Sequence, residues 1–292
     1  MPEQMKTRDF HCDYSNSVGV SAEVTSGLGL DFPDAYKHAE TMAKLALAIK
    51  EHDNAGFCLL PFCRTVEMEA VGGNVNYGNA NTGPRSAAPI CESPEDFLAL
   101  PDIDFSSGRV REVLEACHML ADAGEHVCLE IVGPWTQMQS LMESRKVIKM
   151  QRKQPEKTVE VMNKIGDQLL RYVDEARACG VEIITYSDSA GSLEILSPKL
   201  MEWSTREFTY PFMKKLVEHI DDTMVLQLCP KFAYALIDTG LADVAVHDLG
   251  EKVDFFEAIL QLRGQLKIVG QACIKNTGVA IANGKIRELV LA

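Results

Sequence analysis

The chain has 292 residues, of which 46% are hydrophobic and 24% charged, so it can build a large packed core and is not a disordered protein. Its formal net charge is −13, and it has no basic run long enough to neutralise a line of phosphates, which excludes nucleic acid as the expected partner. This length is typical of one (β/α)8 barrel, and a single domain over residues 1–292 is predicted.

The N-terminal segment and the cysteines predict the compartment. Met1 to Asp9 is polar and charged, is expected to be flexible, and lacks the apolar core of a secretion signal. No apolar stretch reaches the roughly 18 residues that a membrane span needs. Nine cysteines are scattered without a CxxC pair, which is the usage of a reducing compartment. A soluble cytoplasmic protein without membrane contacts is expected.

Runs of β-forming residues alternate with amphipathic stretches, which indicates βα units and a parallel sheet. Strands are expected at 10–20, 56–62, 126–133, 181–187, 224–228, 242–247, 266–271 and 286–291. Helices are expected between them, at 33–52, 109–123, 155–179, 198–220, 231–240 and 253–262. Because right-handed crossovers place every helix outside the ring, this pattern predicts a closed (β/α)8 barrel of the TIM type.

Three segments depart from this regular alternation. The stretch from Arg64 to Asp104 is rich in Gly, Asn and Pro and is predicted to be a long loop insertion at the barrel mouth, after the second strand. The interval 274–285 is too short for a full helix, so an abbreviated final unit is expected. The basic stretch 145–153 is interpreted as a solvated loop or helix face, with a docking patch for an acidic ligand or protein as the alternative.

Candidate catalytic residues follow from the barrel rule that working side chains lie at the C-terminal ends of strands. Asp188 ends the fourth expected strand and is assigned a catalytic role, with metal binding, substrate binding and helix capping as its possible actions. Tyr186 lies beside it, and Glu69 follows the second strand; both are assigned as catalytic candidates. One of Glu67 and Glu69 is expected to enter the mouth, while the other pairs at the rim or with a helix N-terminus.

Candidate substrate-binding residues occupy equivalent positions: Glu67, Glu130, Trp135, Gln227 and His247. Glu130 lies within a run of β-forming residues, where a carboxylate is costly unless it is paired, so a site role and a structural ion pair both stay open. His247 is a lone histidine at a strand end, for which a satisfied core position is the alternative.

Cys229 and Cys273 each come just after an apolar strand and are predicted to face the same mouth of the barrel. Two thiolates with an added Asp, Glu or His suit tetrahedral zinc, which leaves a coordination position open when it is catalytic. The alternative is that both are buried core residues. The remaining cysteines are interpreted as structural.

Several segments resemble one known superfamily when they are read in order. They are FPDAYKHAETMAKLALAIKEHDNAGFCLLPFCRTVEMEAVGGNVNYGN, GPWTQMQSLM, YSDSAGSLEILSPKLMEW, VLQLCPK and IVGQACIKN. The chain is similar from about Asp31 to Cys273 to the methylcobamide:coenzyme M methyltransferases of the uroporphyrinogen decarboxylase superfamily. The resemblance implies the barrel of that superfamily.

The resemblance also implies a function, namely methyl transfer between a corrinoid carried by a partner protein and a small donor or acceptor, assisted by zinc. In that branch zinc is held by an HxC motif and a later cysteine. Here the motif reads Gln227-Leu228-Cys229, which keeps the cysteine and replaces the histidine, and the second cysteine is Cys273. A third ligand is expected from Asp188, Glu69, His247 or another group at a strand end.

Two other functions are weighed against methyl transfer. A lyase similar to uroporphyrinogen decarboxylase is disfavoured because that enzyme's N-terminal segment holds acidic groups with arginine, whereas HCDYSNSVGVSAEV contains none. A non-catalytic subunit that binds a corrinoid protein is the third possibility, and the altered Gln227 motif is its main support.

Overall fold

The computed structural model describes residue 10 and residues 19–192, 195–276 and 278–292. The flexible segment expected at 1–9 and most of the strand expected at 10–20 lie outside the described residues. At the end of that expected strand, the backbone N–H of Val20 donates to the carbonyl of Ala80 at 2.8 Å.

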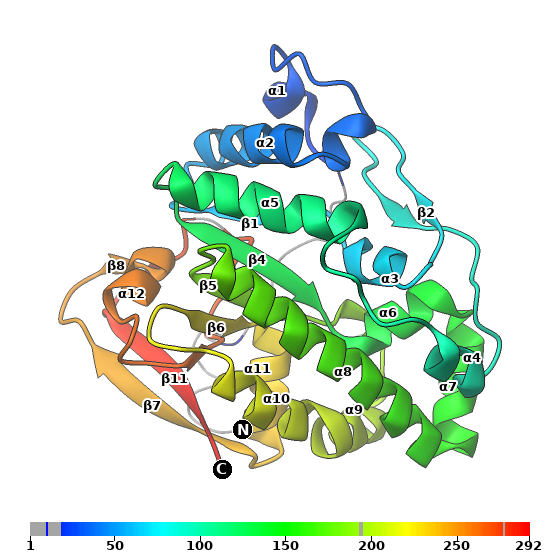
Figure 1. Cartoon of the computed structure of the whole chain (residues 1–292). Helices are drawn as coiled ribbons and strands as arrows, with labels where there is room; N and C mark the ends of the chain where they lie inside the picture. Colours follow the sequence, from blue (N-terminus) through cyan, green and yellow to red (C-terminus); the bar gives the residue numbers. More distant parts are fainter. Residues whose placement is uncertain (1–9, 11–18, 193–194, 277) are drawn as a thin grey trace.

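A seven-stranded sheet forms the centre of the molecule (Figure 1). In spatial order its strands are β1 (Cys58–Leu60), β4 (Val127–Val132), β5 (Ile183–Ser187), β6 (Val225–Leu228), β9 (Ile268–Val269), β11 (Lys285–Leu291) and β7 (Ala242–Asp248). The first five run parallel, and β11 runs antiparallel to both of its neighbours. Every one of these strands falls at a position expected from the sequence.

The parallel strands are buried on both faces, which explains their nearly continuous apolar runs. On β4, Leu129 and Ile131 pack into the hydrophobic cluster under the helices, whereas Cys128 belongs to a second cluster on the opposite face. Ile183 and Val225 lie with Cys128 in that second cluster. Successive side chains of a strand alternate between its faces. The residues two positions further on, Glu130, Thr185 and Gln227, therefore continue along the inner face toward the carboxyl ends of the strands.

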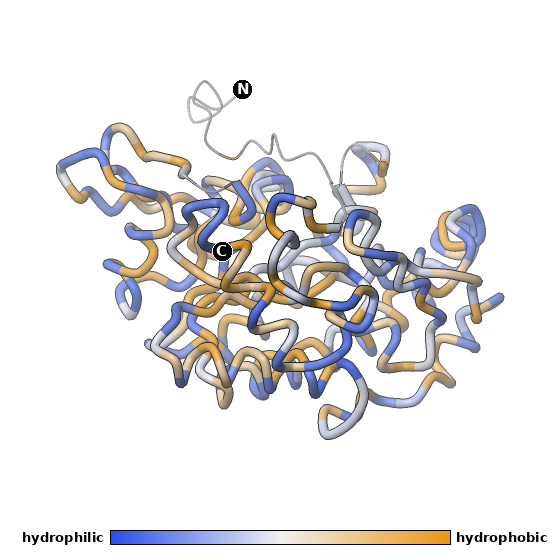
Figure 2. Tube along the Cα trace, turned by 90° about the horizontal axis from the view of Figure 1, so that it is seen from above, coloured by the Kyte–Doolittle hydropathy of each residue, from blue (hydrophilic) through white to orange (hydrophobic). Residues whose placement is uncertain are grey.

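Amphipathic helices cover the outer face of the sheet. They are α2 (Ala39–His52), α5 (Gly108–Asp122), α8 (Pro155–Ala178), α9 (Pro198–Ser204), the π-helical segment η4 (Thr205–Thr209), α10 (Tyr210–Glu218) and α11 (Pro230–Asp238). α12 (Phe255–Gln261) lies on the opposite face of the sheet, where Phe255 and Ile259 pack into the second hydrophobic cluster. Figure 2 shows apolar residues concentrated in the interior and polar residues at the periphery. None of the described helices is both long and apolar enough to span a membrane.

Shorter elements fill the connections. They are α1 (Ala22–Thr25), η2 (Asp34–Tyr36), α3 (Val66–Ala70), β2 (Val75–Asn76), β3 (Arg85–Ser86), α4 (Pro94–Ala99), α6 (Pro134–Leu141), α7 (Ser144–Lys153), η3 (Ser189–Gly191), β8 (Val253–Asp254) and β10 (Ala280–Ile281). The expected long loop at 64–104 is therefore corrected, because it contains two helices and the β2–β3 hairpin.

The order of the last strands also differs from the expected consecutive arrangement. β6 pairs with β9, and β11 lies between β9 and β7. A parallel return needs a crossover of about a dozen residues or more, usually with a helix; the chain after β9 instead forms β10, which pairs with β8, and returns antiparallel. β1 and β7 are the two ends of the sheet, and in the described part of the chain no strand pairing joins them into a closed barrel.

Candidate functional site

Polar side chains meet in a small cavity of about 50 Å³ at the carboxyl ends of β4, β5 and β6. Its walls come from the inner face of the sheet and from the segments after β1, β6 and β9. Successive side chains of a strand point to opposite faces of the sheet. The side chains of Glu130, Thr185, Ser187 and Gln227 therefore lie on the same face, opposite the helices that cover the outer face. This is the end of the sheet at which α/β proteins hold their ligands.

Glu130 is the centre of an ionic network in the cavity, although only 1% of its surface is exposed. Ser187 Oγ donates to Glu130 Oε1 at 2.6 Å, Arg64 Nε lies 3.4 Å from the same oxygen, and Lys275 Nζ pairs with Oε2. Burial raises the pKa of the Glu130 carboxyl, but the charges of Lys275 and Arg64 outweigh it and hold that pKa below its ordinary value. The buried carboxylate is therefore ionised and fixes the two cations at the cavity wall.

Gln227 lies beside this network with its amide fully engaged. Its oxygen accepts from Thr185 Oγ1, and its Nε2 donates to the carbonyls of Leu228 at 2.6 Å and Ala272 at 2.9 Å. These bonds tie β6 to β5 and to the segment after β9. Gln227, at the position where the HxC motif has its histidine, thus joins three segments at the cavity by hydrogen bonds.

Cys229 and Cys273 line the same cavity, as the sequence predicts. Cys229 is the N-cap residue of α11, where the helix dipole favours negative charge. Within the described residues, however, no group of three or more His, Cys, Asp and Glu side chains could hold a metal ion. Among the described residues, the two cysteines of the predicted zinc site therefore have no third His, Cys, Asp or Glu side chain placed to complete it.

Asp188 lines the cavity and holds the N-terminus of α6. Its Oδ2 accepts from the backbone N–H of Trp135 at 2.9 Å, and its Oδ1 accepts from the backbone N–H and the hydroxyl of Thr136 at 2.7 Å. Gly133 permits this close approach, because a Cβ there would lie 2.6 Å from the Asp188 Cβ. Burial raises the pKa of Asp188 to about 6 against these hydrogen bonds. The sequence predicts that Asp188 could cap the helix that follows it, but these contacts cap α6, which precedes it in the chain, and its side chain makes no cap hydrogen bond to the following η3.

Tyr186 and Trp135 do not reach the cavity, which corrects the prediction that they belong to the site. Tyr186 is the outward residue between Thr185 and Ser187, and its ring packs against Phe212 and Phe232. Burial raises the pKa of its hydroxyl well above the ordinary value. Trp135 is 1% exposed, and its indole N–H donates to Ser204 Oγ at 2.7 Å. Both side chains serve the core between sheet and helices.

Glu67 and Glu69 lie on α3, outside the cavity. Glu67 is completely buried; its Oε1 accepts from the backbone N–H of Val132 at 2.8 Å, and its Oε2 has no hydrogen-bond partner among the described residues. Burial raises the pKa of Glu67 to about 7. Glu69 accepts from Arg109 Nε at 2.5 Å and from the hydroxyl of Tyr77. Glu69 is the member of the predicted pair that forms the ion pair.

His247 also lies away from the cavity, on β7 at the edge of the sheet. Its Nε2 pairs with Glu288 Oε2 on the adjacent strand at 2.8 Å. Since β11 and β9 separate β7 from β6, His247 cannot join the cysteines as a ligand in this arrangement. Its predicted position at the mouth is corrected by the strand order.

Three cations at the cavity were not assigned to the site from the sequence: Arg64, Lys231 and Lys275. Arg64 follows the expected second strand, so its position at a strand end pointed to the site, but no role was assigned to it. Lys275 follows Cys273 by two residues, but no pattern in the sequence predicts its contact with Glu130. The cavity wall thus carries three cations beside the carboxyl groups of Glu130 and Asp188, although the chain as a whole is acidic.

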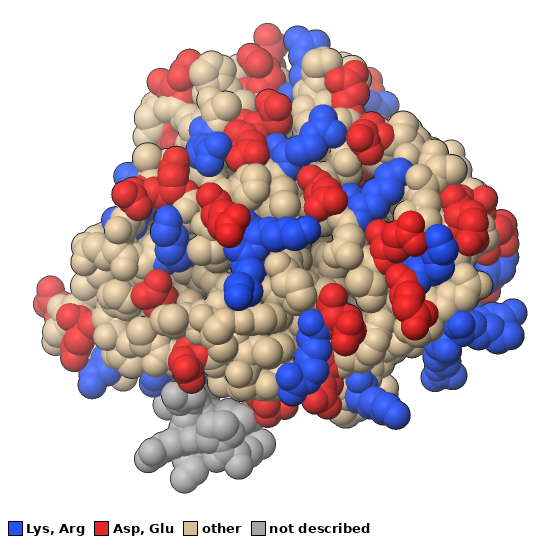
Figure 3. All heavy atoms as spheres, turned by 60° about the horizontal axis from the view of Figure 1, so that its bottom comes forward, with Lys and Arg blue, Asp and Glu red and all other residues tan. Residues whose placement is uncertain are grey.

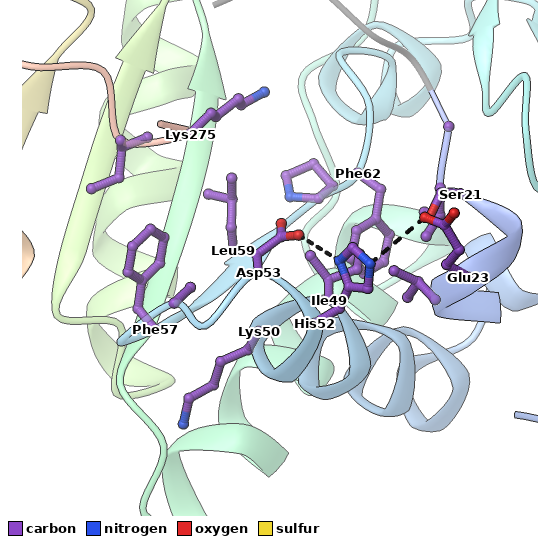
Figure 4. A pocket seen from close by; sticks show the side chains of 16 residues that line it. Ser21, Glu23, Ile49, Lys50, His52, Asp53, Phe57, Leu59, Phe62 and Lys275 are labelled. Atoms are coloured by element: carbon purple, nitrogen blue, oxygen red, sulfur yellow. Dashed lines mark hydrogen bonds and ion pairs between the residues drawn. The ribbon is translucent and has the colours of Figure 1, made fainter. Parts of the chain in front are cut away.

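A second and larger cavity, of about 370 Å³, adjoins the first and shares Ile274 and Lys275 with it. It lies between α1, the end of α2 and β1, and Figure 4 shows Phe57, Leu59 and Phe62 among its apolar walls. On its polar side His52 Nδ1 lies 2.8 Å from Asp53 Oδ1, while its Nε2 is 3.9 Å from Glu23 Oε2 (Figure 4).

Comparison with known families decides the relationship. The sequence profile described as Uroporphyrinogen decarboxylase (URO-D) matches residues 17–273. The chain belongs to the URO-D family. This URO-D chain is 26% identical over 254 residues to "Methylcobamide:CoM methyltransferase MtaA" of Methanosarcina barkeri, covering 85% of the chain and 73% of that protein. The predicted resemblance is confirmed.

More distant relatives of this URO-D family chain agree. It is 24% identical to "Methylcobamide:CoM methyltransferase MtbA" of Methanosarcina acetivorans, covering 72% of the chain and 62% of that protein. A solved structure titled "methyltransferase from Methanosarcina mazei" matches with a TM-score of 0.63 at 22% identity, covering 78% of this chain and 69% of that one. The last likeness shows the shared fold.

Proposed function

We propose that this URO-D family protein transfers a methyl group between a corrinoid, carried by a partner protein, and a small anionic donor or acceptor bound in the cavity. The observation that carries the proposal is the meeting of Cys229 and Cys273 with three cations in a cavity at the carboxyl end of the sheet. The names of the relatives, methylcobamide:CoM methyltransferases, support the corrinoid as one reactant.

The cations support an anionic group on the small reactant. Arg64 and Lys275 are anchored by the ionised Glu130, so their positive ends are held in place before a ligand binds. Preorganised cations in a cavity with little water stabilise an anionic group more strongly than the same charges in bulk solvent. A sulfonate or carboxylate on the small reactant would bind there.

The thiols define where the reaction would occur. In the direction that methylates a thiol, the thiol gives up its proton, the thiolate sulfur forms the bond to the methyl group, and the cobalt–carbon bond breaks with its electron pair left on the corrinoid. Zinc bound to Cys229 and Cys273 would lower the pKa of such a thiol. The described residues offer no third His, Cys, Asp or Glu ligand, so no step is assigned to zinc, and zinc content becomes a separate measurement.

The experiment compares wild type with Cys229→Ala and Cys273→Ala, and uses Cys179→Ala, at the end of α8, as the matched thiol control. Methyl transfer from methylcobalamin to CoM is followed by the absorbance change of the corrinoid, and zinc is measured by elemental analysis. We expect each cavity variant to lose more than about tenfold in rate and the control to keep the wild-type rate.

The outcomes separate the three functions. Wild-type rates in both cavity variants would contradict a role for the thiols. Zinc lost together with activity in Cys229→Ala would support the metal site, and wild-type protein without zinc would remove it. No methyl transfer by wild type to or from any small reactant would leave a non-catalytic binding subunit.

A lyase acting on a carboxylated substrate is the second candidate, and the three cations at the cavity favour it. Incubation with uroporphyrinogen followed by product analysis tests it. We expect no decarboxylation, because a cavity of about 50 Å³ is far too small for a tetrapyrrole polycarboxylate. Release of carbon dioxide by wild type but not by Arg64→Met would reverse this choice.

A further inference from the structure

Helix α7 (Ser144–Lys153) carries a strongly basic face in an acidic chain. Its sequence, SRKVIKMQRK, contains five Lys and Arg residues and no Asp or Glu, whereas the whole chain has a net charge of −13. Val147 and Met150 are buried, which fixes the side of the helix that packs on the protein. The exposed cations are Arg145, Lys149, Arg152 and Lys153.

These four cations point the same way. At 3.6 residues per turn their spacing places them within an arc of about 100° around the helix axis. Among the residues that the structure describes, none forms an ion pair with any of the four; the fifth cation, Lys146, pairs with Glu92. The nearest acidic residues in sequence are Glu143, at the N-cap position, and Glu156, in the first turn of α8.

The stability of the helix does not account for this arrangement. Like charges four residues apart, as in Arg145 and Lys149, destabilise a helix, and cations in the first turn oppose the helix dipole. α7 has no acidic residue in its first turn and no side-chain cap. Arg152 and Lys153 lie in the last turn, where cations favour the helix dipole, so helix stability accounts for these two but not for Arg145 and Lys149. A cluster of like charges that remains without ion pairs at the surface is typical of a binding face for an anionic partner.

The helix stands on the functional side of the sheet. α6 and α7 both lie between the carboxyl end of β4 and the start of α8, and therefore at the end of the sheet that bears the cavity (Figure 1). Figure 3 shows Lys and Arg side chains gathered on the side of the molecule where Figure 1 places α7. α7 follows α6, whose first turn is hydrogen-bonded to Asp188 at the cavity.

We propose that the basic face of α7 is the docking surface of an acidic partner protein. A helix of this length is about 15 Å long, so its basic face has the size of a single contact with another protein. Duplex nucleic acid is longer than this helix, so its phosphates would also lie against the acidic remainder of the protein, which would repel them. A membrane-bound helix needs a free apolar face, whereas Val147 and Met150 are buried within the protein. That the partner is the corrinoid-carrying protein rests on the proposed function.

The test uses fluorescein-labelled poly-L-glutamate as the acidic probe and full-length protein. The triple variant Arg145→Gln, Lys149→Gln, Arg152→Gln is compared with a control of equal charge change, Arg111→Gln, Lys214→Gln, Lys252→Gln, whose residues are exposed on other parts of the surface. We expect the α7 variant to bind the probe about tenfold more weakly and the control to bind like wild type. Binding should also weaken from low salt to about 0.15 M salt.

Equal binding by the α7 variant and wild type, or no binding by wild type at low salt, would overturn the proposal. Tighter binding to phosphatidylserine vesicles or to duplex DNA, lost in the same variant, would overturn the choice of an acidic protein. Circular dichroism shows whether both variants remain folded. Absence of methyl transfer from free methylcobalamin by wild type would refute the proposed function without changing the binding result.

Discussion

At the residue scale, Glu67 is the most strongly perturbed carboxyl that the cavity does not use. It is completely buried, one of its oxygens has no partner among the described residues, and burial raises its pKa to about 7. As the pH rises from the ordinary pKa of 4.5 to about 7, the unfolded chain loses this proton while the folded protein retains it. A raised carboxyl pKa therefore lowers the free energy of unfolding across this range, and the penalty is constant above it.

We predict that the free energy of unfolding of wild type falls by about 3 kcal/mol relative to Glu67→Gln between about pH 5 and pH 8. Glutamine keeps the acceptor for Val132 and removes the ionisation. Denaturant titrations at several pH values measure the difference. Glu51→Gln, an exposed position on α2, should show no such trend. A Glu67→Gln difference that is independent of pH would contradict the prediction.

At the scale of elements, Arg109 joins α5 to the segment between β1 and the β2–β3 hairpin. It is 7% exposed, donates to Glu69 at 2.5 Å and to Thr65 Oγ1 at 2.6 Å, and lies 5.2 Å from the centre of the Tyr77 ring. The region expected to be a loop is ordered around this one buried guanidinium. Its planar fork serves several acceptors at once, which a lysine cannot do.

We predict that Arg109→Met lowers the free energy of unfolding by about 3 kcal/mol, because it leaves Glu69 and the Thr65 hydroxyl without their donor. Arg111→Met, two residues along the same helix and exposed, should change it by less than about 0.5 kcal/mol. Chemical denaturation of both variants measures this. Equal effects of the two substitutions would show that Arg109 does not organise the α3 region.

At the scale of the whole molecule, β11 (Lys285–Leu291) is an interior strand, although it is the last one in the chain. It pairs with β9 on one side and with the full length of β7 on the other. Glu288 adds side-chain links to both neighbours, accepting from the backbone N–H of Lys267 at 2.9 Å and pairing with His247. β7 is therefore held in the sheet through the final segment.

We predict that a chain ending at residue 284 aggregates or fails to fold, because β7 would lose its strand partner and β9 would become an exposed edge of the sheet. A chain that lacks only Ala292, which lies beyond β11, should keep its cooperative unfolding transition. Light scattering and thermal unfolding compare the two. A soluble, cooperatively folded chain without β11 would show that β7 has another attachment.

The sequence located the strands β1, β4, β5, β6, β7, β9 and β11 correctly, because runs of apolar β-forming residues depend on local pattern alone. It also placed Cys229 and Cys273 at one cavity, since both follow strands that end at the same edge. It failed for Tyr186, because assigning a residue to the end of a strand does not say which face it occupies. It failed for His247, because strand order depends on how the connections cross.

What the sequence by itself determined is the family, the alternation of strands and helices, and the cysteine pair, because each is written in local pattern or in the order of segments. The tertiary structure alone decided that Lys275 meets Glu130 across the cavity and that Asp188 holds the start of α6. It also decided that β11 separates β9 from β7. These contacts join residues far apart in the chain, and their energies depend on distance and burial, which no local pattern specifies.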